Sequence, residues 1–263
     1  MRRLPYSATM HVSLVLAALL IPAGVHAQAR VFDHSAFDRL LKAHVSPAGM
    51  VDYDAFERAP GFTRYLGSLA RVDPRSLPEA ERLALWINAY NAYTIALINQ
   101  HEERRSIRNI NKTLGFIKGK GPWGEPLARV GGRDYTLDQI EHEIIRKEFR
   151  EPRIHFALVC AAVGCPPLRR EAYSGDRLDA QLDDQARAFL LRSPAKNRLD
   201  VRAKRVYLSP IFDWYGQDFG QTDAAIGRYL ARFYPAGPMR QLLLGDDFKI
   251  VYTAYDWSLN RQE

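Results

Sequence analysis

The stretch PEAERLALWINAYNAYTIALINQ, residues 78–100, decides the fold of this chain of 263 residues. It begins with proline, which is favoured in the first turn of a helix, and its larger side chains recur at helical spacing. Those at that spacing are Leu83, Trp86, Ile87, Tyr90, Thr94, Leu97 and Ile98. Apolar residues nearly surround the predicted helix, so we expect it to lie deep in the protein.

Weaker patterns predict the elements on either side of this helix. Further helices are expected over residues 32–45, 136–149, 176–191 and 224–233. Short strands are expected over residues 153–160, 199–201, 206–208 and 248–252. The glycine-rich residues 114–133 predict a long loop that contains a hairpin. Together these elements predict an α+β fold: a single domain, mostly helical, with a small sheet in the second half.

The first residues have the three-part pattern of a secretory signal peptide. Arg2 and Arg3 precede a short apolar stretch from about Val12 to Ile21, and small residues follow. The apolar stretch is shorter than the roughly 20 residues that span a bilayer. We therefore expect cleavage near Ala27, with residues 28–263 forming one domain that is periplasmic or secreted. No later segment predicts a transmembrane helix in this mature chain.

The composition is that of an ordinary globular protein with a modest positive charge. The formal net charge is +7, and the predicted signal peptide carries two of those charges. The remaining basic residues are scattered through the sequence, whereas nucleic-acid binding favours a basic stripe or patch. We therefore expect no nucleic-acid partner, and the sequence indicates a small molecule or peptide of unknown identity instead.

Two cysteines occur in the segment IHFALVCAAVGCPPL, residues 154–168. Four interpretations of Cys160 and Cys165 remain open: a structural disulfide, an inert thiol pair, a reactive nucleophile and a redox-cycling pair. Export favours a disulfide, because bridges persist outside the cytosol. The spacing is wider than the Cys-x-x-Cys of thioredoxin-like sites, which disfavours a redox pair.

A cysteine nucleophile needs a base to stabilise its thiolate. In the predicted strand, His155 and Cys160 lie on opposite faces and roughly 16 Å apart, so they do not pair unless the strand bends. His142, on the preceding helix, is the better local candidate. Asn88 and Asn91 share a helix face and are candidates to orient the imidazole or to stabilise an oxyanion. The alternative for these amides is to hold a neighbouring loop.

Several segments together closely resemble the signature segments of the family of unknown function called DUF547. They are residues 86–92 (WINAYNA), 137–142 (LDQIEH), 154–168, 211–215 (IFDWY) and 255–260 (YDWSLN). The resemblance extends over nearly the whole mature chain. It implies thiol chemistry through members that are fused to glutaredoxin-like modules, with the first cysteine the more general one. Val159 departs from the asparagine that precedes this cysteine in some relatives.

Three functional hypotheses follow. The first is a hydrolase or acyl transferase with Cys160 as nucleophile, His142 or His155 as base, and Asn88 or Asn91 as the assisting amide. The second is a thiol–disulfide redox protein that uses Cys160 and Cys165, and the third is a non-enzymatic binding module of the cell envelope. The predicted substrate-binding side chains are Trp86, Trp123 and Arg153. The spacing of the histidines and cysteines matches no zinc pattern, so neither a metal nor another cofactor is expected.

Overall fold

The computed structural model describes residues 30–111 and 121–263. The predicted signal peptide and part of the glycine-rich loop lie outside these described residues. Within them, no helix is both long enough and apolar enough to cross a membrane.

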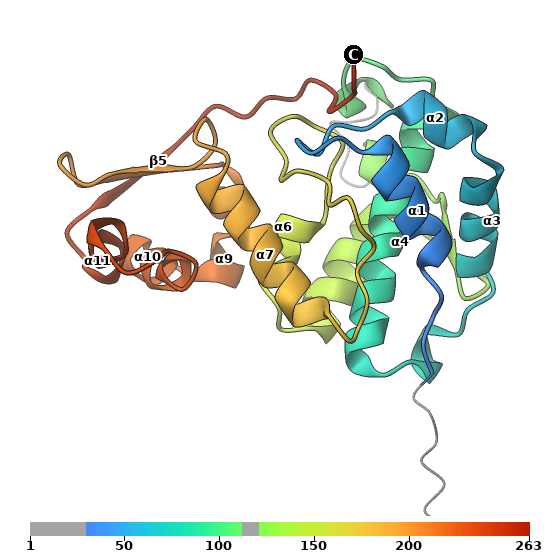
Figure 1. Cartoon of the computed structure of the whole chain (residues 1–263), viewed down its shortest axis with the longest axis horizontal. Coiled ribbons are helices and arrows are strands. Elements are labelled where there is room, and N and C mark those ends of the chain that lie inside the picture. Colours follow the sequence, from blue (N-terminus) through green and yellow to red (C-terminus); the bar gives the residue numbers. More distant parts are fainter. Residues whose placement is uncertain (1–29, 112–120) are drawn as a thin grey trace, which may run out of the picture.

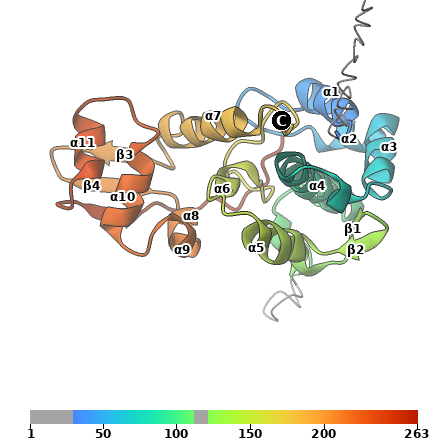
Figure 2. The same cartoon turned by 90° about the horizontal axis from the view of Figure 1, so that it is seen from below.

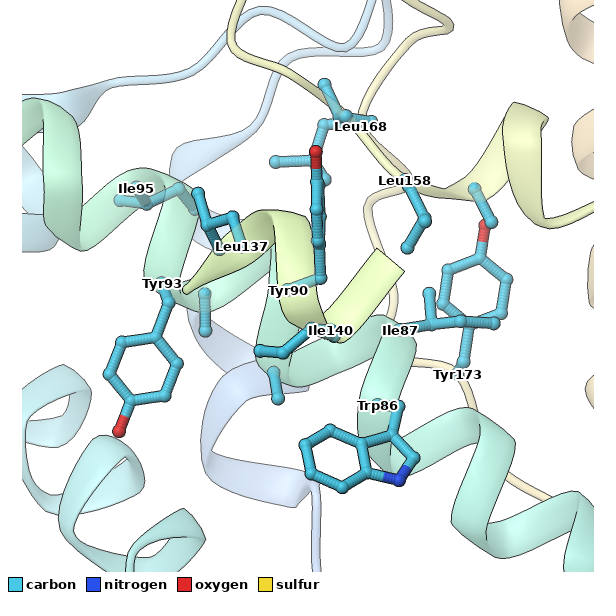
Figure 3. Packing of buried hydrophobic residues seen from close by; sticks show 14 of the residues in the cluster. Trp86, Ile87, Tyr90, Tyr93, Ile95, Leu137, Ile140, Leu158, Leu168 and Tyr173 are labelled. Atoms are coloured by element: carbon cyan, nitrogen blue, oxygen red, sulfur yellow. The ribbon is translucent and has the colours of Figure 1, made fainter. Parts of the chain in front are cut away.

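Helix α4 (Glu79–Gln100) is the central element, as the sequence predicts. Most of its side chains are buried, and Trp86, Ile87 and Tyr90 pack among the residues of the larger hydrophobic cluster (Figure 3). Three helices cover one side of it in the view of Figure 1: α1 (Ser35–His44), α2 (Tyr53–Arg58) and α3 (Pro60–Leu69). Short 3-10 turns follow the chain around this cluster: η1 (Pro74–Ser76), η2 (Ile107–Asn109) and η3 (Pro122–Gly124).

The hairpin predicted within residues 114–133 lies at the end of this stretch and extends to Tyr135. Strand β1 (Ala128–Val130) pairs antiparallel with β2 (Arg133–Tyr135). Gly131 and Gly132 connect them with φ angles of +59° and +77°. Two successive residues with positive φ are the geometry of a tight hairpin turn, which explains why both positions are glycine.

The predicted helix of residues 136–149 begins with the expected capping box. The Thr136 backbone N–H donates to Gln139 Oε1 at 2.9 Å, and the Gln139 N–H donates to Thr136 Oγ1 at 3.0 Å. Its central part, η4 (Gln139–Ile145), is wound as a π-helix, and α5 (Arg146–Glu148) completes it. Wide π turns are uncommon and often occur at functional sites.

The helices and strands that form a smaller hydrophobic cluster lie at the other end of the molecule (Figures 1 and 2). Its sheet has the order β3-β4-β5, with β3 antiparallel and β5 parallel to β4. These strands are β3 (Arg198–Asp200), β4 (Arg205–Leu208) and β5 (Lys249–Tyr252). The helices here are α7 (Leu178–Leu191), α8 (Ile211–Trp214), α9 (Gly216–Phe219), α10 (Asp223–Ala231) and α11 (Pro238–Leu244). The mostly helical α+β class with small sheets is therefore confirmed.

One predicted element is wrong. Residues 153–160 do not form a strand, because Ile154–Ala157 make a single helical turn, α6, and only the residues after it are extended. The turn joins the two hydrophobic clusters: Ile154 packs in the larger one and Phe156 in the smaller. A run of apolar residues fits a buried turn as well as a buried strand, since every side is covered in both cases.

Candidate functional site

A cavity of about 180 Å³ lies where the two hydrophobic clusters meet, and we call it the disulfide pocket. Cys160 and Cys165 form part of its wall, together with His142 and His155. Six aromatic rings enclose much of the rest: Tyr90, Trp123, Trp214, Tyr215, Tyr255 and Trp257. Two carboxylates, Asp138 and Glu141, also border it. The pocket therefore combines sulfur, imidazole, carboxylate and aromatic groups from segments that are far apart in the sequence.

The extended residues between α6 and the cysteines are held in place by Asn91. Its Nδ2 donates to the Ala157 carbonyl at 2.9 Å, and its Oδ1 accepts from the Val159 N–H at 2.9 Å. Asn91 is buried, so these backbone groups would have no water to bond if the amide were lost. The amide thus fixes the direction in which the chain reaches Cys160.

The disulfide loop, residues 160–165, is paired with the C-terminal segment, residues 255–260. The Val163 N–H donates to the Ser258 carbonyl, and the Gly164 N–H donates to the Asp256 carbonyl, both at 2.8 Å. Gly164 has no side chain for a physical reason: a Cβ at this position would lie 2.9 Å from the ring of Tyr255. The close approach places the Tyr255 ring directly against the loop.

Cys160 and Cys165 form a disulfide whose two sulfurs have different surroundings. Cys160 is partly exposed, whereas Cys165 is buried. The Cys165 sulfur accepts from the Cys160 N–H at 3.0 Å and from the Tyr255 hydroxyl at 3.1 Å. The same hydroxyl lies 3.1 Å from the Cys160 sulfur. Burial raises the pKa of Tyr255 well above its ordinary value, so its hydroxyl keeps its proton near neutral pH.

His155 borders the pocket because residues 154–157 form a helical turn and not a strand. Its Nε2 lies 2.6 Å from Oδ2 of Asp218, and its ring stacks on Tyr215 with 3.9 Å between centroids. Arg146 also donates two hydrogen bonds to Asp218. The hydrogen bonds from His155 and Arg146 hold the pKa of Asp218 well below its usual range. An ionised Asp218 accepts from Nε2, which leaves the lone pair of a neutral His155 on Nδ1.

His142 borders the same pocket from η4, but its hydrogen bonding differs. Arg146 Nη1 lies 3.2 Å from His142 Nδ1. A guanidinium only donates, so Nδ1 is the acceptor and carries no proton. The lone pair of a neutral His142 is therefore already used, which makes His155 the better placed base.

The carboxylates of η4 border the pocket among hydroxyl groups. Glu141 is buried, and burial together with this neighbouring carboxylate raises the pKa of Tyr90 and Tyr215 well above the ordinary value. Burial also raises the pKa of Asp138. The described structure therefore places two acidic groups at one wall of a largely aromatic cavity.

Asn88 is a predicted site residue that the structure places outside the pocket. Its amide donates to the Tyr173 carbonyl at 2.8 Å and accepts from the Tyr173 N–H at 3.0 Å. Asn88 and Asn91 therefore both hold loops, which was the alternative to an orienting or oxyanion role. Neither amide is bonded to a histidine.

Trp86 and Arg153 are likewise not brought to the disulfide pocket. Trp86 is buried against Tyr135 and borders a different cavity. Arg153 is ion-paired with the carboxylates of Glu151, Asp179 and Asp183, so it links α6 to α7. Trp123, the third predicted substrate-binding residue, does border the disulfide pocket.

Sequence reasoning missed Asp218 and most of the aromatic wall. Asp218 follows His155 by 63 residues, and no local pattern connects them. Tyr215, Tyr255 and Trp257 lie in two of the segments that resemble family signatures, which was the available signal. Among the residues that the structure describes, no group of three or more His, Cys, Asp or Glu residues is arranged to hold a metal ion.

Comparison with known proteins gives one match. No curated protein and no solved structure matches the chain. Residues 74–190 match the model of the family described as "Protein of unknown function, DUF547". The matched range contains α4, η4, α6 and both cysteines, and so most of the wall of the disulfide pocket. By this match, residues 74–190 of the chain are similar to the DUF547 family.

Proposed function

We propose that this protein carries out thiol–disulfide exchange, with Cys160 as the sulfur that a substrate thiol attacks and Cys165 as the sulfur that leaves. The observation that carries the proposal is the asymmetry of the disulfide. Cys160 is partly exposed at the pocket wall, whereas Cys165 is buried and its sulfur accepts from the Cys160 N–H. The Tyr255 hydroxyl lies 3.1 Å from both sulfurs. Donors to a sulfur stabilise its thiolate, and a stabilised thiolate leaves faster.

The first step forms a mixed disulfide. A substrate thiol loses its proton, and its thiolate attacks the Cys160 sulfur in line with the S–S bond. The bond between Cys160 and Cys165 breaks, and its electron pair stays on Cys165. The Tyr255 O–H and the Cys160 N–H then stabilise this new thiolate. We assign His155 as the base that takes the proton of the substrate thiol. Asp218 accepts from its Nε2–H, so a lone pair remains on Nδ1.

The second step releases the product. A second substrate thiolate attacks the substrate sulfur of the mixed disulfide, and Cys160 leaves as a thiolate that takes up a proton. Two substrate thiols thus become one substrate disulfide, and the two electrons reside on Cys160 and Cys165. The reverse sequence reduces a substrate disulfide and restores the bridge.

A cysteine-dependent hydrolase or acyl transferase is a second candidate, and a specific arrangement favours it. Cys160 and His155 border the same pocket, and His155 is hydrogen-bonded to Asp218. Cysteine, histidine and aspartate are combined in the same way in cysteine–histidine–aspartate catalytic sites. This activity needs the bridge reduced, because a disulfide sulfur is no nucleophile. A Cys165→Ser variant separates the candidates: it retains acyl transfer, but it cannot form the bridge and so cannot oxidise substrate thiols. If Cys160 and Cys165 can both be replaced without loss of ligand binding, the cell-envelope binding module is favoured instead.

We also propose that the protein is exported, on the signal-peptide pattern of its first 27 residues. Exported compartments keep disulfides oxidised, which is the state of Cys160 and Cys165 here. Mass spectrometry of the protein recovered from the cell envelope or medium tests this, with a mature chain that begins just after Ala27 as the expected result. A chain that retains residues 1–27 would contradict export by this route.

The test of the proposed function is a redox titration of the folded protein. Mixtures of reduced and oxidised dithiothreitol or glutathione set the potential, and alkylation followed by mass spectrometry measures the fraction reduced. Exchange proteins have potentials between about −120 and −270 mV, whereas structural bridges typically lie below about −300 mV. We expect the potential of the Cys160–Cys165 pair to lie in the range of the exchange proteins. A potential below it would refute thiol exchange.

A further inference from the structure

The walls of the disulfide pocket are mainly aromatic. Trp257 lies between three other rings, with centroid distances of 4.6 Å to Tyr255, 5.8 Å to Trp214 and 6.2 Å to Trp123. Trp214 is 47% exposed, so this wall reaches the surface beside the disulfide. The face of an aromatic ring is electronegative and attracts a cation that lies over it.

Apart from the imidazoles of His142 and His155, the charged side chains of the described pocket wall are acidic. Asp138 and Glu141 border it, and none of its described wall residues is lysine or arginine. Arg108 and Arg146 lie over the rings of Trp257 and Tyr215, at 5.1 and 5.3 Å, but neither borders the cavity. The whole chain has a net charge of +7, so an acidic wall here is a local feature that the overall composition does not predict.

Aromatic faces and carboxylates, here the buried Glu141 and the partly exposed Asp138, select the same kind of ligand. A quaternary ammonium or a primary ammonium gains from both, because each interaction strengthens when water is excluded. An anionic ligand is disfavoured, because the two carboxylates and the electronegative faces of the rings repel it. The volume of about 180 Å³ suits a ligand of only a few heavy atoms, or one short arm of a larger one.

We infer that the disulfide pocket binds a small cationic thiol or its disulfide, with the ammonium group among the aromatic rings beside Glu141 and the sulfur at Cys160. This inference rests on the proposed thiol exchange and names its substrate class. The reaction is unchanged: the thiolate of the aminothiol attacks Cys160, and Cys165 leaves.

The experiment compares three small thiols of similar size: cysteamine, which is cationic, 2-mercaptoethanol, which is neutral, and 3-mercaptopropionate, which is anionic. The rate of reduction of the folded protein is measured by alkylation and mass spectrometry, and is divided by the thiolate concentration of each reagent. Cysteamine should react fastest and 3-mercaptopropionate slowest, with at least about tenfold between them. Glu141→Gln should remove most of this difference. Glu143→Gln is the matched control, because Glu143 lies on the same helix, is exposed and does not border the disulfide pocket.

A second measurement keeps the inference separate from the chemistry. Tetramethylammonium, which has no thiol, should quench the tryptophan fluorescence of the wild type saturably and should bind Glu141→Gln and Asp138→Asn more weakly. Equal reduction rates for the three thiols would overturn the inference and leave thiol exchange standing. Failure of every thiol to reduce the folded protein would refute thiol exchange, and the tetramethylammonium titration would then decide alone whether the cation site exists.

Discussion

Tyr255→Phe tests the role of the Tyr255 hydroxyl, which contacts both sulfurs. The substitution keeps the ring that packs against Gly164, Trp214 and Trp257 and removes only the donor to Cys160 and Cys165. In the oxidised protein this donor meets two neutral sulfurs. After reduction it meets a thiolate, for which a hydrogen bond is worth more.

The magnitude follows from that difference. A hydrogen bond to a charged group contributes about 1.5–3 kcal/mol, and the lower end applies because sulfur is a weak acceptor. About 1.4 kcal/mol corresponds to one pKa unit and, for a two-electron couple, to about 30 mV. We therefore expect Tyr255→Phe to raise the pKa of the Cys165 thiol in the reduced protein by about one unit. The potential should become more negative by about 30 mV at a pH where wild-type Cys165 is ionised.

Two assays check these values. The pH dependence of alkylation at Cys165, resolved by peptide mapping, gives the thiol pKa, and a dithiothreitol titration gives the potential. Tyr252→Phe is the matched control, because Tyr252 is 41% exposed and contacts neither sulfur. Tyr252→Phe should leave the thiol pKa and the potential unchanged. If Tyr255→Phe also leaves them unchanged, the Tyr255 hydroxyl does not stabilise the Cys165 thiolate and this part of the proposal is wrong.

Three further predictions concern stability. Asp218→Asn should lower the free energy of unfolding by about 1–2 kcal/mol at pH 7, because Arg146 loses the charge of its partly exposed partner. The folded-state pKa of Asp218 is depressed, so its stabilisation is present above about pH 4 and is lost progressively below it; the difference in Tm between wild type and variant should therefore shrink in acid. Asn91→Ala should cost about 2–4 kcal/mol in a chemical denaturation experiment, because two buried backbone groups lose their partners. Reduction of Cys160 and Cys165 should cost only about 2 kcal/mol, because the closed loop is short, and near-ultraviolet circular dichroism should still show a folded protein.

Each of these has a contrary outcome, and Asn91→Ala has a matched control. A Tm difference for Asp218→Asn that is constant from pH 7 to pH 3 would show that its charge is not what stabilises the site. Asn109→Ala removes an exposed amide and should change the free energy of unfolding by less than about 0.5 kcal/mol. If Asn91→Ala lowers it by no more than this, the hydrogen bonds of Asn91 to Ala157 and Val159 contribute little. Loss of the native circular dichroism spectrum on reduction would make the bridge structural.

Local patterns predicted the parts of the fold that local physics determines. Helix α4 follows from a long run of apolar residues that only a buried helix accommodates, and the start of η4 follows from the capping box of Thr136 and Gln139. The hairpin follows from Gly131 and Gly132. In each case the residues that decide the element lie within a few positions of one another.

The pocket depends on contacts that no local pattern contains. Residues 154–157 are apolar except for His155, and a run of this kind does not distinguish a buried turn from a buried strand, so the position of His155 was predicted on the wrong geometry. Asp218 and Tyr255 reach the site through long-range packing, 63 and 95 residues from the partners that they contact. Cys160 and Cys165 were recognisable as a site, whereas their bonding state depended on the path of the chain between them.

The central claim is that the Cys160–Cys165 bridge exchanges with thiols while the protein stays folded, and the most direct test is reduction without denaturant. The protein is treated with dithiothreitol at neutral pH, alkylated at intervals and mapped by mass spectrometry, while near-ultraviolet circular dichroism monitors the fold. The account predicts that both cysteines become alkylated within minutes and that the folded spectrum is retained. Labelling that requires guanidinium as well as reductant would contradict it.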